Sequence, residues 1–264
     1  MKHLKKACIL GSVLSLGLFL NSAQARPLNE VLATKTLNVV TTASNPPHGF
    51  LDPGTNTLQG IMVDIAKGIA QHLGVSISFT NVPFAGLIPT LTSGRADLMA
   101  APLFITEERA KVVDFTTPVY GWGEGIIMTA DSKQHYPDFE SLKGHKIGTL
   151  VDSVQYRMLK DMPGTTVSTY QDYPTLLADV RARRIEIGLI DPPSITYQIQ
   201  SKSIPGLKLD EQYKPQNDWK IGGAVEKGNA DLLAAVNKAL EQMKQNGELH
   251  AILDKWGLGQ LMVK

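Results

Sequence analysis

One stretch of the chain combines residue types that suit the binding of a small anion. It runs from Leu98 to Tyr120, with Thr106-Glu107-Glu108-Arg109 at its centre. The Thr106 hydroxyl suits the N-cap of a helix that starts at Glu107, and acidic residues suit a first helical turn. A cation in that turn is unfavourable, so Arg109 there favours an anionic partner. Because a guanidinium donates two parallel hydrogen bonds to a carboxylate, this stretch predicts a carboxylate receptor.

An ordinary ion pair is the alternative for this arginine, since Glu107, Glu108 and Asp114 all lie nearby in the sequence. A second charged residue, Asp191, directly follows an apolar run and precedes two prolines. A carboxylate there faces the ligand edge of a sheet or caps the helix that follows. Both alternatives remain open on residue types alone.

The elements that position these residues follow from apolar periodicity and from breaker residues. Ligands of open α/β sheets bind outside the carboxyl ends of the strands, which places the loop after Thr42, the Val82-Pro83-Phe84 turn and Ala101 to Arg109 at one edge. The first half predicts strands at 37–42, 75–80 and 96–100, helices at 59–73 and 84–92, and a loop at 43–52. This order predicts a parallel sheet with helices on both faces.

A second α/β unit follows Pro118. It predicts strands at 125–129, 146–149, 165–170 and 185–190, and helices at 153–161, 172–181 and after Asp191. Residues 219–226 are again strand-like, and two amphipathic helices, one from 229 or 230 to 245 and one from 248 to 256, close the chain.

These motifs together resemble a known family. The sequence around Arg109 resembles the "ITPERxKxVDFSxPYY" motif of the extracellular solute-binding proteins of amino-acid ABC importers (family 3). The resemblance continues through Gly60–Ala66, Val82–Pro89, Ile190-Asp191, Gly223–Asn229 and Ile252–Gly257, and it covers nearly all of the chain after residue 35. The order and spacing of the motifs carry the resemblance more than any one of them.

The resemblance implies an α/β, two-lobed periplasmic-binding-protein fold, in which each lobe is a mostly parallel sheet flanked by helices. Two crossover hinge strands, at 120–125 and 219–223, would join the lobes. The implied organisation is a signal peptide at 1–25, a first lobe at 26–120 completed by 222–264, and a second lobe at 121–221. A bound solute would favour closure about the hinge, because only the closed form contacts it from both lobes.

The resemblance also assigns residue roles. It implies that Arg109 binds the ligand's α-carboxylate, that Asp191 binds the α-ammonium, and that Phe84 packs on the ligand side chain. Phe84 as a core residue is an equal alternative.

Several uncharged residues at the site positions differ from those typical of the family. Phe104 stands at a Ser or Thr position, Pro102 at a Gly or Ser position, Val154 at a Thr position, and Asn45 and His48 at aromatic positions; Ser153 keeps a hydroxyl, and Met62 replaces an acid. We therefore expect a small carboxylate, with or without an amine, that has a partly apolar body, bound by Arg109, Asp191, Phe84, Phe104, Ser153, Val154, Pro102 and Asn45.

The N-terminus and the composition bound the remaining functions. Lys2, Lys5 and Lys6 precede a short apolar stretch and Ala23-Gln24-Ala25, which is typical of a cleavable signal peptide, with an uncleaved anchor as the alternative. The single cysteine, Cys8, lies inside that stretch, so we expect neither a lipid anchor nor a disulfide. The predicted product is a periplasmic monomer. A net charge of +1 does not suggest nucleic acid.

We predict that the protein carries a small amino-acid-like solute to a membrane ABC permease, without cofactor, metal or catalytic residues. A sensor or chemoreceptor ligand-binding protein would use the same closed form. The alternative from another class is an exported enzyme on the same scaffold, similar to cyclohexadienyl dehydratase, because cleft carboxylates support acid–base chemistry. However, the sequence contains no metal-ligand cluster and no Ser-His-Asp or Cys-His signature.

Overall fold

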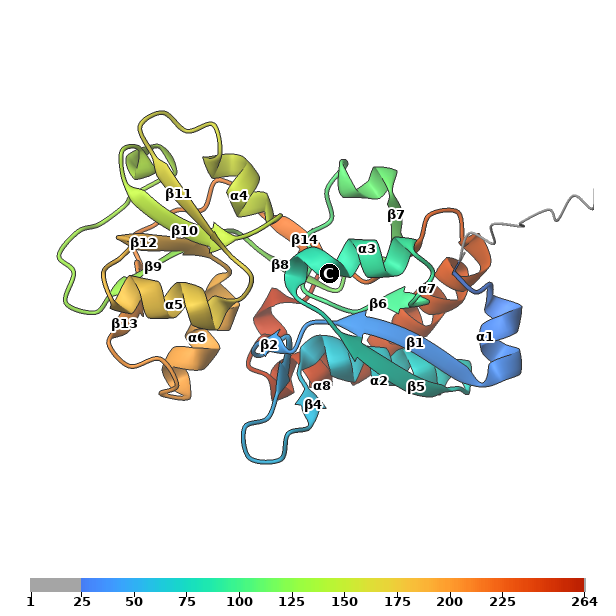
Figure 1. Ribbon diagram of the computed structural model, residues 1–264. Coiled ribbons are helices and arrows are strands. Elements are labelled where there is room, and N and C mark those ends of the chain that lie inside the picture. The colour runs from blue at the N-terminus through green and yellow to red at the C-terminus, as the bar shows by residue number, and fades with distance from the viewer. Residues whose placement is uncertain (1–24, 264) are drawn as a thin grey trace, which may run out of the picture.

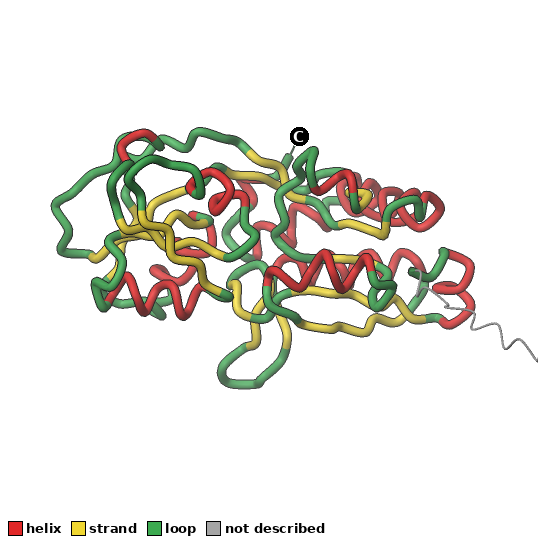
Figure 2. The backbone as a smooth tube through the Cα atoms, turned by 45° about the horizontal axis from the view of Figure 1, so that its top comes forward, coloured by secondary structure: helices red, strands yellow, loops and turns green. Residues whose placement is uncertain are grey.

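The computed structural model describes residues 25–263 and contains two lobes, each built around a five-stranded sheet (Figures 1 and 2). The two-lobed α/β architecture expected from the sequence is confirmed. The expected signal peptide lies outside the described residues except for Ala25, and so does Cys8. Within residues 25–263, no helix is both long and apolar enough to cross a membrane.

The first lobe is a mixed sheet covered by helices on both faces. Its strands follow the order β5 (Ser76–Asn81), β1 (Thr36–Thr41), β6 (Leu98–Met99), β15 (Ala224–Glu226) and β7 (Val113–Phe115). The first three strands are parallel, and β15 runs antiparallel to both of its neighbours. Its helices are α1 (Leu28–Thr34), α2 (Ile61–Leu73), α3 (Leu87–Thr92), α7 (Ala230–Gln245) and α8 (Glu248–Lys255). Two apolar cores lie on opposite faces, one under α2 and α7 and one under α3.

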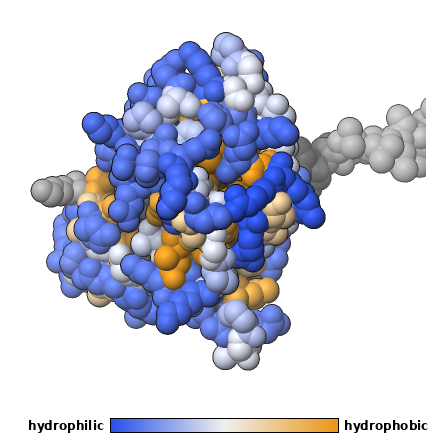
Figure 3. Space-filling model, turned by 90° about the vertical axis from the view of Figure 1, so that its left-hand side faces the viewer, coloured by the Kyte–Doolittle hydropathy of each residue, from blue (hydrophilic) through white to orange (hydrophobic). Residues whose placement is uncertain are grey.

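The second lobe repeats this plan. Its strands follow the order β11 (Thr166–Tyr170), β10 (Lys146–Leu150), β12 (Ile187–Ile190), β9 (Gly125–Thr129) and β13 (Leu207–Leu209). The strands β11, β10 and β12 are parallel, and β9 is antiparallel to β12 and β13. Its helices are α4 (Val154–Leu159), α5 (Tyr173–Arg181) and α6 (Pro192–Gln200), with the 3₁₀ turn η3 (Glu140–Leu142). Seen end-on, this lobe presents mostly hydrophilic side chains (Figure 3).

Two short strands join the lobes. β8 (Tyr120–Trp122) pairs antiparallel with β14 (Trp219–Ile221), and both lie between the two large sheets (Figure 1). The chain returns to the first lobe at β15, and after η4 (Gly259–Leu261) the Val263 amide donates to the Val119 carbonyl. These strands fall within the segments predicted as crossovers.

Most predicted elements match the structure within two residues, because their breakers are correctly placed. The helix α2 ends at Gly74, which adopts a left-handed conformation with φ 69°. Asp172 caps α5 by accepting a hydrogen bond from the Thr175 amide.

Several boundaries were wrong. The predicted loop at 43–52 instead forms a small antiparallel sheet of β2 (Ser44–Asn45), β3 (Gly49–Leu51) and β4 (Leu58–Gln59). These strands are too short to show a periodicity in the sequence. The strand predicted at 219–226 divides at Gly222 into β14 and β15, which belong to different sheets. The helix predicted from residue 84 begins with a 3₁₀ turn, η1 (Phe84–Gly86).

A buried carboxylate anchors the start of the described chain. Asp97 accepts hydrogen bonds from the Arg26 guanidinium and, at 2.7 Å, from the Asn38 amide. Its side chain is almost completely buried. Since breaking a buried ion pair leaves an uncompensated charge, this contact contributes strongly to the stability of the first lobe.

We expect Asp97→Ala to lower the free energy of unfolding by about 3 kcal/mol, as measured by urea denaturation. The matched control is Glu140→Ala, which breaks an exposed pair with Lys143 and should change stability by less than about 0.5 kcal/mol. Equal losses in the two variants would contradict the anchoring role of Asp97.

Candidate functional site

Arg109 is a buried cation at the junction between the lobes. Only 3% of the residue is exposed, and burial lowers the pKa of its guanidinium to about 10, so it stays charged at neutral pH. Its Nη1 donates to the Phe104 carbonyl (3.0 Å), and its Nη2 donates to the Asp152 carbonyl of the second lobe (3.2 Å). Nε is buried without a hydrogen-bond partner in the described chain. A guanidinium has five N–H donors, so two carbonyls leave donors for an anion.

The alternative for Arg109, an ion pair with a neighbouring acid, is not formed. Glu108 pairs with Arg157 and Asp114 pairs with Lys227, while no carboxylate in residues 25–263 lies within ion-pair distance of Arg109. A buried cation without an opposite charge is costly, so this geometry favours an external anion.

The helix predicted to start at Glu107 is wrong. Arg109 instead opens a single 3₁₀ turn, η2 (Arg109–Lys111), because the chain enters β7 two residues later. The Thr106 hydroxyl still accepts a hydrogen bond from the Arg109 amide, at 3.3 Å. A single turn has little dipole, so the positive charge of the site comes from the guanidinium itself.

Asp191 is a buried carboxylate on the opposite lobe. It follows β12 and precedes α6, yet its side chain makes no capping hydrogen bond to that helix. Its Oδ1 accepts from Trp122 Nε1 (3.2 Å) and Gln155 Nε2 (2.9 Å), and its Oδ2 accepts from the Tyr173 hydroxyl (3.0 Å). Burial raises the pKa of Asp191, and these three donors oppose that shift. The capping alternative is therefore wrong, and the carboxylate keeps acceptor capacity for a fourth donor.

Aromatic residues lie beside the two charged groups at the junction. Trp122, whose indole N–H holds Asp191, contacts the Phe104 ring with centroids 5.5 Å apart and stacks on His48 at 4.8 Å. Phe104 also packs on Trp219 at 4.7 Å, while its carbonyl holds Arg109. Phe104 thus lines the junction with its ring and contacts Arg109 only through its backbone.

Of the other predicted site residues, Phe84, Val154 and Asn45 contact groups at the junction, whereas Ser153 and Pro102 form no hydrogen bond with these groups among residues 25–263. The Arg109 guanidinium lies over the Phe84 ring, with Cζ 5.8 Å from the ring centroid, and Val154 packs in the same apolar cluster as Phe104. The Asn45 Oδ1 accepts a hydrogen bond from Ser194 Oγ at 2.6 Å. Ser153 instead caps α4, because its hydroxyl accepts from the Tyr156 amide and donates to the Leu150 carbonyl. Pro102 is buried beside Leu103.

Four residues of this junction were missed at the sequence level: Trp122, Gln155, Tyr173 and Ser194. They come from a crossover strand and three different helices, and no local motif marks them as one group. Trp122 carried a signal, since it lies in the segment predicted as a crossover, and His48 was noted at a site position without being predicted to bind the ligand.

Besides the backbone hydrogen bonds at the crossover strands, three polar side-chain contacts among the described residues join the lobes. Arg109 donates to the Asp152 carbonyl, Ser194 donates to Asn45, and Arg157 pairs with Glu108. Each contact joins a residue of the first lobe to one of the second. The structure is therefore a closed arrangement of the two lobes.

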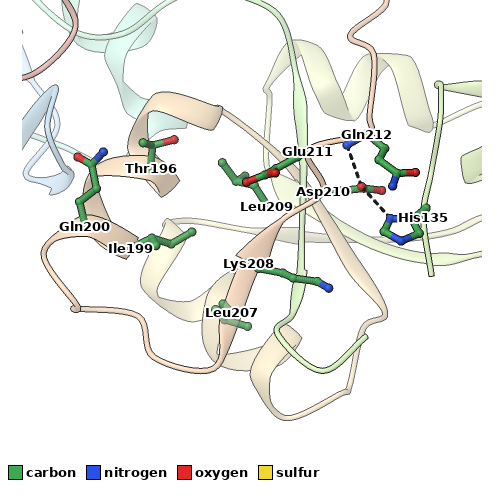
Figure 4. A pocket seen from close by; sticks show the side chains of 10 residues that line it. All are labelled: His135, Thr196, Ile199, Gln200, Leu207, Lys208, Leu209, Asp210, Glu211 and Gln212. Atoms are coloured by element: carbon green, nitrogen blue, oxygen red, sulfur yellow. Dashed lines mark hydrogen bonds and ion pairs between the residues drawn. The ribbon is translucent and has the colours of Figure 1, made fainter. Parts of the chain in front are cut away.

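A pocket of about 550 Å³ elsewhere on the second lobe carries no comparable constellation. It lies between α6, β13 and the loop at His135, where Asp210 contacts His135 and the Gln212 amide (Figure 4). Neither Arg109 nor Asp191 lines it. Among the described residues, no group of three or more His, Cys, Asp and Glu side chains is placed to hold a metal ion.

Comparison with known proteins gives one consistent result. Residues 37–260 match the model of "Bacterial extracellular solute-binding proteins, family 3". The chain is 32% identical to the L-cystine-binding protein TcyJ of Escherichia coli (strain K12), with 97% of each chain covered. It is 30% identical to a putative ABC transporter arginine-binding protein 2 of the same organism, covering 85% of this chain and 91% of the relative.

Solved structures agree with the sequence comparison. A mutant of ArgBP from T. maritima superimposes with a TM-score of 0.80 at 28% identity, covering 87% of this chain and 98% of the other. The ancestral amino acid-binding protein AncCDT-1, a precursor of cyclohexadienyl dehydratase, superimposes with a TM-score of 0.79 at 28% identity and the same coverage.

Proposed function

Because this chain belongs to the bacterial extracellular solute-binding proteins, family 3, we propose that it captures a small amino-acid-like zwitterion between its lobes for an ABC permease. One observation carries the proposal. A buried guanidinium and a buried carboxylate stand on opposite lobes; each acts on the pKa of the other across the junction, but neither has an oppositely charged group within ion-pair distance among residues 25–263. A zwitterion supplies both missing charges at once.

In this proposal Arg109 binds the α-carboxylate and Asp191 binds the α-ammonium. The remaining N–H donors of Arg109 and the remaining acceptor capacity of Asp191 suit those two groups. Phe84, Phe104 and Val154 supply apolar walls, and Asn45 contributes through its contact with Ser194. Ser153 supports the site by capping α4 with its hydroxyl, and Pro102 lies buried in the segment that leads to Phe104.

A zwitterion bound by both Arg109 and Asp191 also explains why the two lobes close on the ligand. Only a closed arrangement brings Arg109 and Asp191 to the same zwitterion, so a ligand that binds both favours that state by its differential affinity. We assign residues 26–120 and 222–264 to the first lobe and 121–221 to the second, with β8 and β14 as the hinge between them. Because Trp122 lies on β8 and donates to Asp191, the ammonium site is connected directly to the hinge.

We propose the transporter partner and the cellular location by analogy with the matched relatives. The matched relatives are named as cystine- and arginine-binding proteins, and the second of them as part of an ABC transporter. We assign this chain to the periplasm as a monomer, released from its signal peptide after Ala25. A dehydratase activity is the alternative, because one structural neighbour is named as a precursor of such an enzyme.

A thermal-shift screen of the mature protein, refolded to remove bound solute, tests this function. The panel contains amino acids, their deaminated and decarboxylated analogues, and other small carboxylates. A ligand at a hundredfold excess over its Kd should add about 2.7 kcal/mol of stability. Stabilisation that needs both the carboxylate and the amine supports the proposal. No hit among the amino acids would contradict it, and turnover of a bound ligand would favour the enzyme.

Trp122→Phe should weaken binding of the ligand found in that screen about tenfold, because Asp191 loses one of its three donors while the aromatic ring is kept. Isothermal titration calorimetry measures the change. The control is Trp256→Phe, which removes an indole N–H bonded to Asp64 within the first lobe. If both variants bind like the wild type, Trp122 does not position the ammonium site.

A further inference from the structure

Uncharged polar atoms without partners gather beside the proposed zwitterion site. Within residues 25–263, five buried side-chain nitrogen or oxygen atoms have no hydrogen-bond partner, and three are Thr41 Oγ1, Thr42 Oγ1 and His48 Nε2. Arg109 Nε is the fourth, and the fifth belongs to Glu124. Folded proteins pair nearly all such atoms, so a group of them at one place needs a physical reason.

These three residues lie at the ligand edge of the first-lobe sheet. Thr41 ends β1, and Thr42 follows it at the carboxyl end of the strand, where open α/β sheets bind their ligands. Gly49, the residue after His48, packs directly on them. A Cβ atom at Gly49 would lie 2.6 Å from the Thr42 carbonyl and 3.1 Å from Thr41 Oγ1. The polar atoms are therefore grouped by the fold of β1 against β3.

His48 connects this group to the charged site. It stacks on Trp122, which donates to Asp191, and its Nδ1 lies 3.0 Å from the Tyr120 hydroxyl. The imidazole is fully buried, and burial lowers its pKa to about 3, so it is neutral at physiological pH. Thr41, Thr42 and His48 thus offer hydrogen bonds without charge.

None of the other buried acids of the described chain forms a hydrogen bond or ion pair with the residues of the zwitterion site. Asp97 is bonded to Arg26, and Asp210 to the Tyr136 and Gln212 amides. Glu124 accepts hydrogen bonds from the Tyr213 hydroxyl and the Gln216 amide through Oε1, while its Oε2 has no partner among residues 25–263. At the rim, Glu108 is paired with Arg157, and the Asp152 side chain is exposed. A third ligand charge at the buried junction would therefore remain uncompensated.

We infer that the site selects an amino acid whose side chain carries no net charge and ends in hydrogen-bonding groups, which Thr41, Thr42 and His48 receive. This inference rests on the proposed function and names the ligand class within it. It separates this chain from a binding protein for arginine, although relatives with that name are among its matches.

Calorimetry of the refolded mature protein with glutamine, norleucine, arginine and glutamate tests the inference. We expect glutamine to bind tightest, and arginine and glutamate to bind about a hundredfold more weakly. Tightest binding by arginine or glutamate would overturn the inference while leaving the proposed function intact. Equal affinity for norleucine would overturn the hydrogen-bonding part. No binding of any amino acid would overturn both proposals.

Isosteric variants assign the effect to the threonines. In Thr41→Val and Thr42→Val, the affinity of the best polar ligand relative to norleucine should fall about tenfold, because one hydrogen bond is lost at nearly constant volume. Thr42→Ser, which restores a hydroxyl, should recover most of the ratio. The control is Thr90→Val, a buried threonine on α3, which should keep the ratio. Unchanged ratios in both β1 variants would contradict the inference, and thermal denaturation of each variant confirms folding.

Discussion

Replacing Arg109 with methionine should weaken ligand binding by about 3 kcal/mol, or roughly 150-fold in Kd. Methionine approximates the volume of the stem but removes the only buried cation in the described part of the chain. The ligand carboxylate would then be buried without a charged donor. Isothermal titration calorimetry with the ligand found in the screen measures this change.

The stability of the unliganded Arg109→Met variant distinguishes lost binding from lost folding. Without ligand, Arg109 has no carboxylate within ion-pair distance among residues 25–263, so replacing it by an apolar group should leave the melting temperature similar or higher. Arg109→Lys should bind with intermediate affinity, because it keeps the charge and loses the planar fork. Arg183→Met, which removes an exposed guanidinium paired with Asp131 within the second lobe, is the control and should bind within a few-fold of the wild type. Full affinity in Arg109→Met would exclude the carboxylate role.

Replacing Asp191 with asparagine should weaken binding of the amino acid by about 3 kcal/mol and leave its deaminated analogue nearly unaffected. Asparagine keeps the shape of the side chain but loses the charge that the ammonium needs. It also turns an N–H₂ group toward donors such as Gln155 Nε2. Calorimetry with the matched pair of ligands separates the ammonium contact from a general loss of the site.

The pH dependence of binding gives a second measure of Asp191. Burial raises its pKa, so protonation begins at a higher pH than for an exposed aspartate. Since the protonated acid cannot pair with an ammonium, wild-type affinity should fall as the pH is lowered through this raised pKa. The Asp191→Asn variant should show no such decline. Asp161→Asn, which changes an exposed acid on the same lobe, should retain it. An identical pH profile in Asp191→Asn and the wild type would contradict the ammonium role.

The sequence predicted those parts of the fold that local patterns encode. Gly74 marks the end of α2 and Asp172 marks the start of α5, because both act through their own backbone neighbourhood. The small sheet at 44–59 was missed, since two-residue strands have no periodicity. The turn at Arg109 was predicted as a helix because cap residues indicate where a helix begins, not how far it continues.

The candidate site, like the fold, was predicted only where a sequence motif marks its residues. The positions of Arg109 and Asp191 at opposite lobes followed from the order of the motifs, whereas their partners did not. Trp122, Gln155 and Tyr173 approach Asp191 from a hinge strand and two helices that lie far apart in sequence. Such convergence depends on tertiary packing, which no local pattern records. Ser153 shows the converse, because a hydroxyl expected at the ligand serves as a helix cap.

The crystal structure of the mature protein with its bound ligand tests the central claim most directly. The claim is that one zwitterion joins Arg109 to Asp191 across the two lobes. We predict that the ligand carboxylate lies within hydrogen-bond distance of the Arg109 guanidinium and that the ammonium lies within hydrogen-bond distance of an Asp191 carboxylate oxygen. A ligand bound at another place, or one whose carboxylate and ammonium contact other residues, would contradict the claim.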